Sequence, residues 1–160
     1  MNHKYLLAIS IILLNCSFLK AQTFTGIGDT IPDDGNSIDF TITASGLPNV
    51  IDTDNFGVET ICIDLIHTYD SDLDIYLIAP DGTQVLLTSA NGGADDNYTN
   101  TCFNYYATTP ISQGIAPFTG TFKPQGQLGI VNNGQNPNGD WKLHIQDTYP
   151  FADQGVLFTW

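Results

Sequence analysis

The sequence contains no arginine, four lysines and a single glutamate, Glu59. All 17 acidic residues follow residue 21, where Lys123 and Lys142 are the only basic residues, and the formal net charge of the whole chain is −13 at pH 7. Phosphate binding depends on clustered lysine and arginine side chains. The composition therefore predicts that nucleic acid is not a partner of this protein.

The sequence also lacks a long apolar run after its first 21 residues, so no transmembrane helix is expected there. Residues 6–14 are almost entirely apolar and follow a weakly basic start, which is typical of a secretory signal peptide. We expect cleavage after Ala21, which predicts a signal peptide at residues 1–21 and a secreted or cell-surface domain at residues 22–160. A lipid anchor on Cys16 is the less favoured alternative, because bulky and polar residues precede that cysteine.

Local signatures of hydrolases are missing as well. The sequence has no Gly-x-Ser-x-Gly, His-Gly-Thr, Gly-Thr-Ser or His-Glu-x-x-His motif. Two histidines follow residue 21: His144 is expected on the polar face of a strand, and His67 at the end of an apolar strand. We interpret both as structural or solvated side chains, so the sequence predicts no catalytic residue and no binding site for an organic cofactor.

Alternating apolar and polar residues, separated by turns rich in glycine, asparagine and proline, make up most of the chain after residue 21. Such period-two patterns predict half-buried β-strands, and Pro80-Asp81-Gly82 between two of them predicts a β-hairpin. The predicted strands lie at residues 38–42, 58–67, 73–77, 84–89 and 141–145 and from residue 155 onward. Because no amphipathic helix of useful length is present, we expect an all-β, jelly-roll-like antiparallel β-sandwich.

Three cysteines occur in the sequence, and Cys16 falls in the predicted signal peptide. Cys62 and Cys102 then remain as an even pair in an exported and oxidising setting, where disulfides form and persist. We predict that these two cysteines are bonded to each other. Two buried thiols are the alternative.

Aspartates gather in two segments that offer hard oxygen ligands. Asp70, Asp72 and Asp74 have the spacing of the first three ligands of a helical calcium loop, although the glycine and glutamate that complete such a loop are missing. On a strand, this spacing would place the three carboxylates on one side. Asp95 and Asp96, in a glycine-rich loop, would complete a structural calcium site. Aspartates of other turns as ligands, or solvated carboxylates without a metal, are the alternatives.

An ordered series of short motifs runs through most of the predicted domain. They are His67-Thr68-Tyr69, Ser71-Asp72-Leu73-Asp74-Ile75-Tyr76-Leu77, Pro80-Asp81-Gly82-Thr83, Asn91-Gly92-Gly93, Asp96-Asn97-Tyr98, Ala116-Pro117-Phe118-Thr119-Gly120 and Asn138-Gly139-Asp140-Trp141-Lys142-Leu143. The series resembles the P-domain, or Homo B domain, of kexin- and furin-like proprotein convertases and related bacterial secreted peptidases. The resemblance covers nearly all of the chain from Ile31 to Trp160.

The resemblance implies a non-catalytic β-sandwich that packs against a subtilisin-type serine endopeptidase domain, stabilises it and influences its calcium and pH dependence. The catalytic triad of that family has no matching positions in this chain, so the proteolytic activity is not carried over. Family members continue through the rest of their final strand, which implies that the last strand here is truncated at Trp160. We expect a module that stabilises or docks a protease catalytic domain.

A free-standing cell-surface adhesion or carbohydrate-binding sandwich is the alternative function. Aromatic side chains in loop-like segments would then stack on sugars or on a partner surface protein. The candidates are Tyr98, Tyr105, Tyr106, Tyr149 and Phe151.

Overall fold

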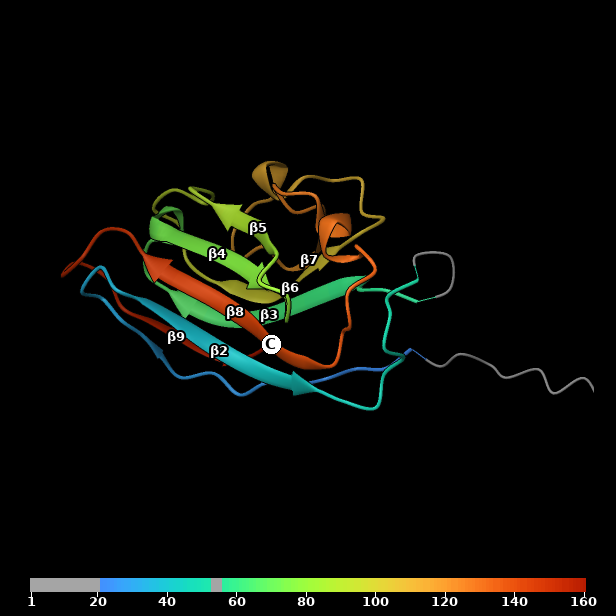
Figure 1. Ribbon diagram of the computed structural model, residues 1–160. Helices are drawn as coiled ribbons and strands as arrows, with labels where there is room; N and C mark the ends of the chain where they lie inside the picture. Colours follow the sequence, from blue (N-terminus) through green and yellow to red (C-terminus); the bar gives the residue numbers. More distant parts are fainter. Residues whose placement is uncertain (1–20, 53–55) are drawn as a thin grey trace, which may run out of the picture.

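The computed structural model describes residues 21–52 and 56–160, so the predicted signal peptide lies outside the described residues except for Ala21. Two β-sheets face each other in this part of the chain (Figure 1). The strands are β1 (Thr30–Ile31), β2 (Ser37–Ala44), β3 (Thr60–His67), β4 (Leu73–Ile78), β5 (Gln84–Ser89), β6 (Tyr98–Asn104), β7 (Gly120–Phe122), β8 (Gly139–Asp147) and β9 (Gly155–Thr159). Three short 3-10 helices are η1 (Asp70–Asp72), η2 (Ile111–Gln113) and η3 (Leu128–Val131). The predicted all-β sandwich is confirmed.

The first sheet has the strand order β1-β9-β3-β6-β7, and the second has the order β2-β8-β4-β5. All pairs are antiparallel except β6 with β7, which is parallel. The predicted hairpin is present, because β4 and β5 are joined by a tight turn in which the Gly82 N–H donates to the Ala79 carbonyl at 2.9 Å. Gly82 has φ +87°, a left-handed conformation that favours glycine.

The core lies between the two sheets and follows the alternation seen in the sequence. On β4, Leu73, Ile75 and Leu77 are fully buried, and on β8 the same holds for Leu143 and Ile145. The opposing sheet contributes buried side chains from β3, β6 and β9, namely Ile63, Leu65, Phe103 and Leu157. Each such apolar side chain stabilises the fold by roughly 1.5–3 kcal/mol relative to an exposed one.

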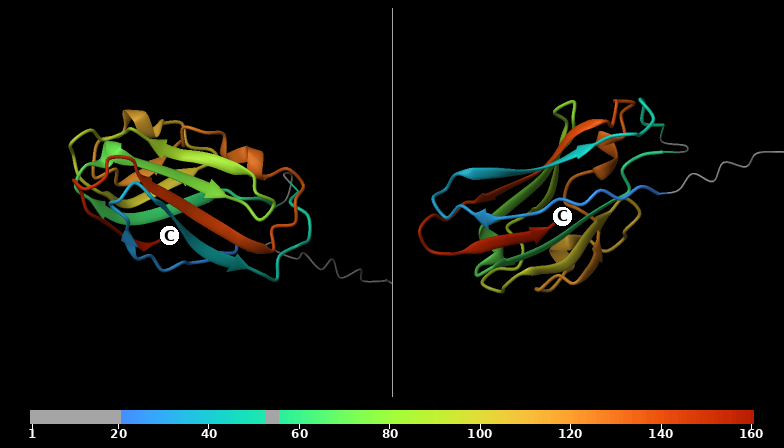
Figure 2. Two further views of the ribbon diagram at one scale, coloured as in Figure 1. Left: turned by 60° about the vertical axis from the view of Figure 1, so that its left-hand side comes forward. Right: turned by 90° about the horizontal axis from the view of Figure 1, so that it is seen from below.

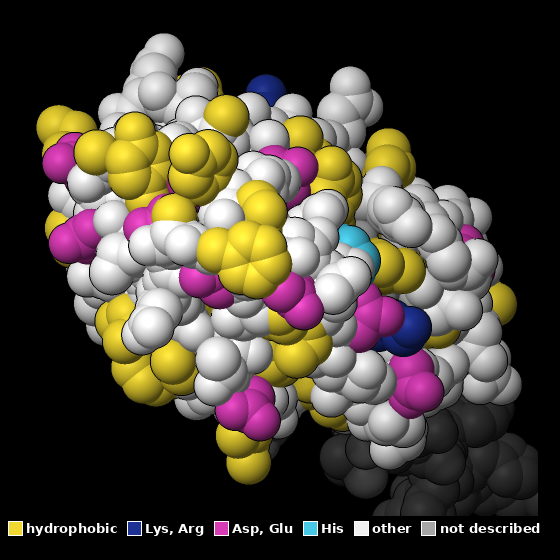
Figure 3. All heavy atoms as spheres, turned by 90° about the vertical axis from the view of Figure 1, so that its left-hand side faces the viewer, with side chains coloured by type: hydrophobic (Ala, Val, Ile, Leu, Met, Phe, Trp, Pro, Cys, Tyr) yellow, Lys and Arg dark blue, Asp and Glu magenta, His cyan; other side chains and the backbone are white. Residues whose placement is uncertain are grey.

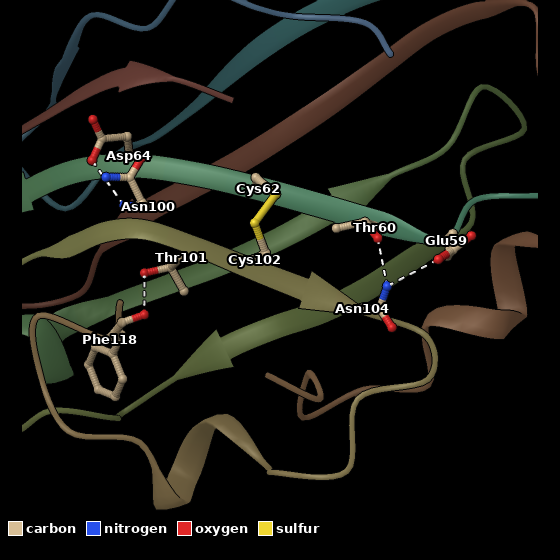
Figure 4. The surroundings of a disulfide bond; sticks show 9 residues. All are labelled: Glu59, Thr60, Cys62, Asp64, Asn100, Thr101, Cys102, Asn104 and Phe118. Atoms are coloured by element: carbon tan, nitrogen blue, oxygen red, sulfur yellow. Dashed lines mark hydrogen bonds between the residues drawn. A yellow bond between two sulfur atoms is a disulfide. The ribbon is translucent and has the colours of Figure 1, made fainter. Parts of the chain in front are cut away.

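One disulfide joins neighbouring strands of the first sheet. Cys62 on β3 lies directly opposite Cys102 on β6, with the two Cα atoms 4.0 Å apart (Figure 4). The predicted bond between these cysteines is therefore confirmed, and it fixes the register of β3 against β6. In the described part of the chain, no helix is long and apolar enough to cross a membrane.

We predict that replacing both cysteines with serine lowers the free energy of unfolding by roughly 2–4 kcal/mol, because the unfolded chain loses a closed loop. The two positions are 40 residues apart. Urea unfolding followed by tryptophan fluorescence measures the change. A reduced wild-type protein serves as the control and should match the double variant; an unchanged midpoint in both samples would contradict a stabilising role.

Candidate functional site

Four loops meet at one end of the sandwich and form what we call the acidic end. They are residues 32–36, 68–72, 91–97 and 148–154. Hydrogen bonds join them: the Asp70 N–H donates to the Asp95 carbonyl at 3.0 Å, and the Thr148 N–H donates to the Asp72 carbonyl at 2.8 Å. Loops far apart in the sequence are thereby held together.

The acidic end combines carboxylates with exposed aromatic rings. Its loops carry Asp33, Asp34, Asp70, Asp72, Asp95, Asp96 and Asp153, and none of them contains a lysine. Figure 3 views this end of the molecule and shows acidic and hydrophobic side chains intermixed on its surface. This surface is suited to cationic ligands and to partners with basic and apolar groups.

Asp70 occupies the centre of this end and is completely buried. Its Oδ1 atom accepts a hydrogen bond from the Asn97 N–H at 2.8 Å, whereas its Oδ2 atom is buried without a hydrogen-bond partner. The 91–97 loop approaches so closely that a Cβ on Gly92, which has φ +90°, would lie 2.7 Å from the Asp70 Cβ. A glycine is therefore needed at position 92 for the loop to close over this carboxyl.

The pKa of Asp70 is raised to about 7, chiefly by burial and to a smaller extent by the negative charges of Asp96 and Asp95, against the opposing effect of the Asn97 N–H. A buried carboxylate with an unpartnered oxygen costs free energy unless a proton or a cation neutralises it. Among the side chains at this end, Asp70 is therefore the one that a bound proton or cation would stabilise most.

The strand interpretation of their spacing required Asp72 and Asp74 to lie on the same side as Asp70. In the structure they do not. Asp70 and Asp72 lie in η1, and the strand β4 begins only at Leu73. Asp72 is partly exposed, and burial together with the charges of Asp153 and Asp147 raises its pKa. Asp74 lies on β4 beyond the turn, on the outward side of the second sheet. The strand interpretation was wrong because a 3-10 turn breaks the period of two.

Asp95 and Asp96 are exposed, and their loop lies against Asp70, whose N–H donates to the Asp95 carbonyl at 3.0 Å. Within residues 21–52 and 56–160, no group of three or more His, Cys, Asp or Glu side chains is arranged to hold a metal ion. Of the five predicted ligands, the structure thus places Asp70, Asp72, Asp95 and Asp96 in the loops of the acidic end and leaves Asp74 on β4, outside these loops.

His67 forms a buried pair that the sequence did not reveal. Its Nε2 atom lies 3.1 Å from Asp147 Oδ2, and its Nδ1 atom lies 3.0 Å from the Tyr69 carbonyl and 3.2 Å from the Tyr69 N–H. The imidazole and the carboxylate are both about 1% exposed. Both ring nitrogens are engaged, so this pair ties β3 to the end of β8 and leaves no nitrogen to activate a nucleophile.

His144 lies on the outward face of β8, as predicted. Its Nδ1 atom lies 2.6 Å from Asp39 Oδ1, and Lys142 donates to Asp39 Oδ2 at 2.8 Å. These hydrogen bonds hold the pKa of Asp39 below its usual value, with Lys142 the largest contributor. The three residues form a cross-strand surface network between β2 and β8.

The exposed aromatics among the predicted loop candidates divide between the two ends of the sandwich. At the acidic end, Phe151 is 83% exposed and Tyr149 is 63% exposed. Tyr105 and Tyr106 follow β6 at the opposite end and are also exposed. The interpretation of Tyr98 as a loop aromatic available for binding was wrong. Tyr98 is a fully buried residue of β6 that stacks on Phe118, with the ring centroids 4.7 Å apart.

The fold and this site define a class of protein, a disulfide-linked β-sandwich module with its acidic and aromatic loops gathered at one end. Residues 58–160 match the family model of the proprotein convertase P-domain. Because this match covers more than half of the chain, the protein belongs to the P-domain family. Membership associates the chain with proteases, in agreement with the resemblance of its motifs.

A comparison with curated proteins finds a relative in leupeptin-inactivating enzyme 1 of Streptomyces exfoliatus. The two are 32% identical over 142 residues, which cover 87% of this chain and 25% of the relative. The chain thus spans about a quarter of the length of that protein.

We predict that, in a buffer containing a chelator, the protein loses stability as pH rises from about 4 to 7. The folded state binds the Asp70 proton more tightly than the unfolded state, because its pKa is raised from 3.8 to about 7. The contribution of the Asp70 proton to the free energy of unfolding is therefore complete below about pH 4. It falls by at most about 4 kcal/mol as the pH rises through the folded-state pKa.

Asp70→Asn mimics the protonated carboxyl and should remove this pH-dependent loss. Asp74→Asn, on the outward side of β4, is the matched control and should retain it. Urea midpoints measured at each pH for the three proteins give the comparison. A wild-type protein whose stability is flat between pH 4 and 7 would contradict the assignment.

Proposed function

We propose that this protein is a non-catalytic P-domain module of an exported peptidase, which docks against a subtilisin-type catalytic domain and stabilises it. Family membership supports this proposal most directly. In the described part of the chain, the buried histidine–aspartate pair is fully occupied by structural contacts, so the arrangement favours a scaffold over a reactive centre. The disulfide fits an extracellular location.

The acidic end supplies the surface that we assign to docking. Tyr149 and Phe151 project from it with large exposed fractions, and a surface of aromatic residues surrounded by charges is typical of a protein interface. The chain carries a net charge of −13, so a catalytic domain with a basic contact face is the complementary partner.

The test uses residues 22–160 and a separately purified subtilisin-type catalytic domain of an exported peptidase. We expect the module to bind it and to lengthen its half-life at elevated temperature. The double variant Tyr149→Ala, Phe151→Ala should weaken binding roughly tenfold, or about 1.4 kcal/mol, because exposed aromatics at an interface contribute most of the affinity. Calorimetric titration measures the affinity.

The matched control is the double variant Tyr105→Ala, Tyr106→Ala, which removes two exposed aromatics from the opposite end. It should bind like the wild type. Equal weakening by both double variants would exclude the acidic end as the docking surface. Absence of binding, together with glycan-array binding that depends on Tyr149 and Phe151, would favour the carbohydrate-binding alternative.

We also propose that calcium binds at the acidic end, with Asp70 as its central ligand. The support is the buried Oδ2 atom of Asp70, which has no protein partner, beneath a loop that carries Asp95 and Asp96. Calcium accepts carboxylate, backbone carbonyl and water oxygens, so it does not require three converging carboxylates. Asp70 and one or both loop aspartates would hold the ion, and its charge would neutralise the buried carboxylate.

Calcium should raise the melting temperature of the wild-type protein at pH 7.5, and a chelator should lower it. Asp70→Asn and Asp96→Asn should each abolish the calcium-dependent shift, whereas Asp140→Asn, an exposed acid on β8, should preserve it. Differential scanning calorimetry with and without about 2 mM calcium records the shifts. This concentration is above the dissociation constants of typical weak extracellular calcium sites. Identical melting in calcium and chelator would remove the site.

A further inference from the structure

The outer edges of the two sheets differ in how they are protected. In the first sheet, the edge strands β1 and β7 are only two and three residues long. In the second sheet, a loop covers β5, because the Gly126 N–H donates to the Leu86 carbonyl at 2.8 Å. The remaining edge strand, β2, is eight residues long. Figure 2 (right), seen from the side of this strand, shows it along the margin of the sandwich.

The strand β2 is regular and has an unpaired outer side. Its residues pair with β8 without a register shift, whereas the ladder between β4 and β5 contains one. Among the described residues, no backbone hydrogen bond reaches the side of β2 that faces away from β8. Proline, bulges and lysine side chains commonly protect exposed edges, and β2 contains none of them. A long and regular edge of this kind is suited to pairing with another strand.

The exposed residues of β2 direct their backbone groups away from the sheet. β2 and β5 are opposite edges of one antiparallel sheet and run in opposite directions, so a half-turn about the sheet normal relates them. Leu86 faces outward from β5, and its carbonyl points off the edge. Side chains and backbone groups alternate together along a strand, so the outward-facing residues of β2 also direct their N–H and C=O groups off its edge. These residues are Ser37, Asp39, Thr41 and Thr43.

The side chains along this edge indicate which strand would fit it. The inward-facing Ile38 and Ile42 are only partly buried, so apolar side chains beside them would complete the core at its rim. On the outward face, Asp39 lies on β2 and Asp140 lies on the neighbouring strand β8. Lys142 is bonded to Asp39, which leaves Asp140 as an excess negative charge. A strand with basic outward side chains would be attracted, whereas a second copy of the chain, with its net charge of −13, would be repelled.

We propose that the free edge of β2 binds an extended strand of a partner protein, which runs antiparallel to β2 and has basic or polar residues facing outward and apolar residues facing inward. The outward residues of the partner strand form hydrogen-bonded pairs with the exposed residues of β2. Its inward residues pack against Ile38 and Ile42. Main-chain hydrogen bonds provide affinity, and the alternate side chains provide specificity. This inference is independent of the proposed docking through the acidic end.

The test titrates residues 22–160 with the synthetic peptide Lys-Val-Thr-Val-Lys-Ile-Thr, acetylated and amidated at its ends. In the antiparallel register its two lysines lie opposite Thr43 and Asp39. We expect saturable binding by calorimetry and, by NMR, roughly tenfold slower hydrogen exchange at the Asp39 and Thr41 amides. The Phe40 amide, which faces β8, should not change. Absence of protection at Asp39 and Thr41 in the presence of saturating peptide would overturn the proposal.

Two methylated peptides separate strand addition from nonspecific apolar binding. Methylation of the backbone nitrogens of the third and fifth peptide residues, which face β2, should weaken binding roughly tenfold because two hydrogen bonds are lost. Methylation of the second and fourth, which face away from β2, is the matched control and should leave binding unchanged. Equal affinities of the two methylated peptides would contradict the proposed pairing.

A pair of protein variants tests the same contact from the other side. Thr41→Pro removes an N–H that faces the free edge and leaves the ladder to β8 intact, so it should weaken binding roughly fivefold. Thr41→Ser keeps the N–H and should bind like the wild type. Equal affinities of the two variants would exclude the edge of β2. The methylated peptides use the wild-type protein, so the test does not depend on folding of the proline variant.

The charge of the partner strand is tested separately. A peptide with glutamate in place of both lysines should bind roughly tenfold more weakly at low salt, because its carboxylates lie near Asp39 and Asp140. Equal affinities of the basic and acidic peptides would overturn the assignment to a basic strand.

Other occupants of the edge would also appear in these experiments. Protection of Asp39 and Thr41 that increases with protein concentration in the absence of peptide would assign the edge to a second copy of the chain. Protection without peptide that is the same at every concentration would assign it to another segment of the same polypeptide. Either result contradicts a partner strand.

Discussion

Contact between the apolar faces of the two sheets is the interaction on which the rest of the structure depends. Ile75 and Leu77 of β4 and Leu143 of β8 are fully buried against the first sheet. This contact fixes the two sheets relative to each other and so determines which loops meet at each end. The acidic end follows from it, since it is formed by loops that the core holds at the rim of the sandwich.

Much of the fold was predictable from the sequence because its strands have one buried and one exposed face. The alternation of Trp141, Leu143 and Ile145 with polar residues predicted β8, and Pro80-Asp81-Gly82 predicted the hairpin between β4 and β5. The disulfide was predictable from the even number of cysteines that follow the predicted signal peptide. The parallel pairing of β6 with β7 was not, because a three-residue strand has too little pattern to reveal its direction.

The candidate site was only partly predictable, because its contacts join residues distant in the sequence. Asp70 and the 91–97 loop were named together as ligands, but no pattern indicated that Asp70 would be buried or that η1 would precede β4. His67 and Asp147 are 80 residues apart, and neither has a local signature for the pair.

The scarcity of basic residues limits the positions at which an endopeptidase specific for basic residues could cleave this chain. An endopeptidase that requires lysine or arginine before the cleaved bond finds such a residue in the described chain only at Lys123 and Lys142. Lys142 lies in the middle of β8 between two hydrogen-bonded neighbours, and the Lys123 N–H is bonded to the Thr109 carbonyl, with Pro124 next in sequence. Cleavage needs an extended, unpaired segment, so both bonds require local unfolding first. In the folded domain, both bonds are therefore protected from endopeptidases of that specificity.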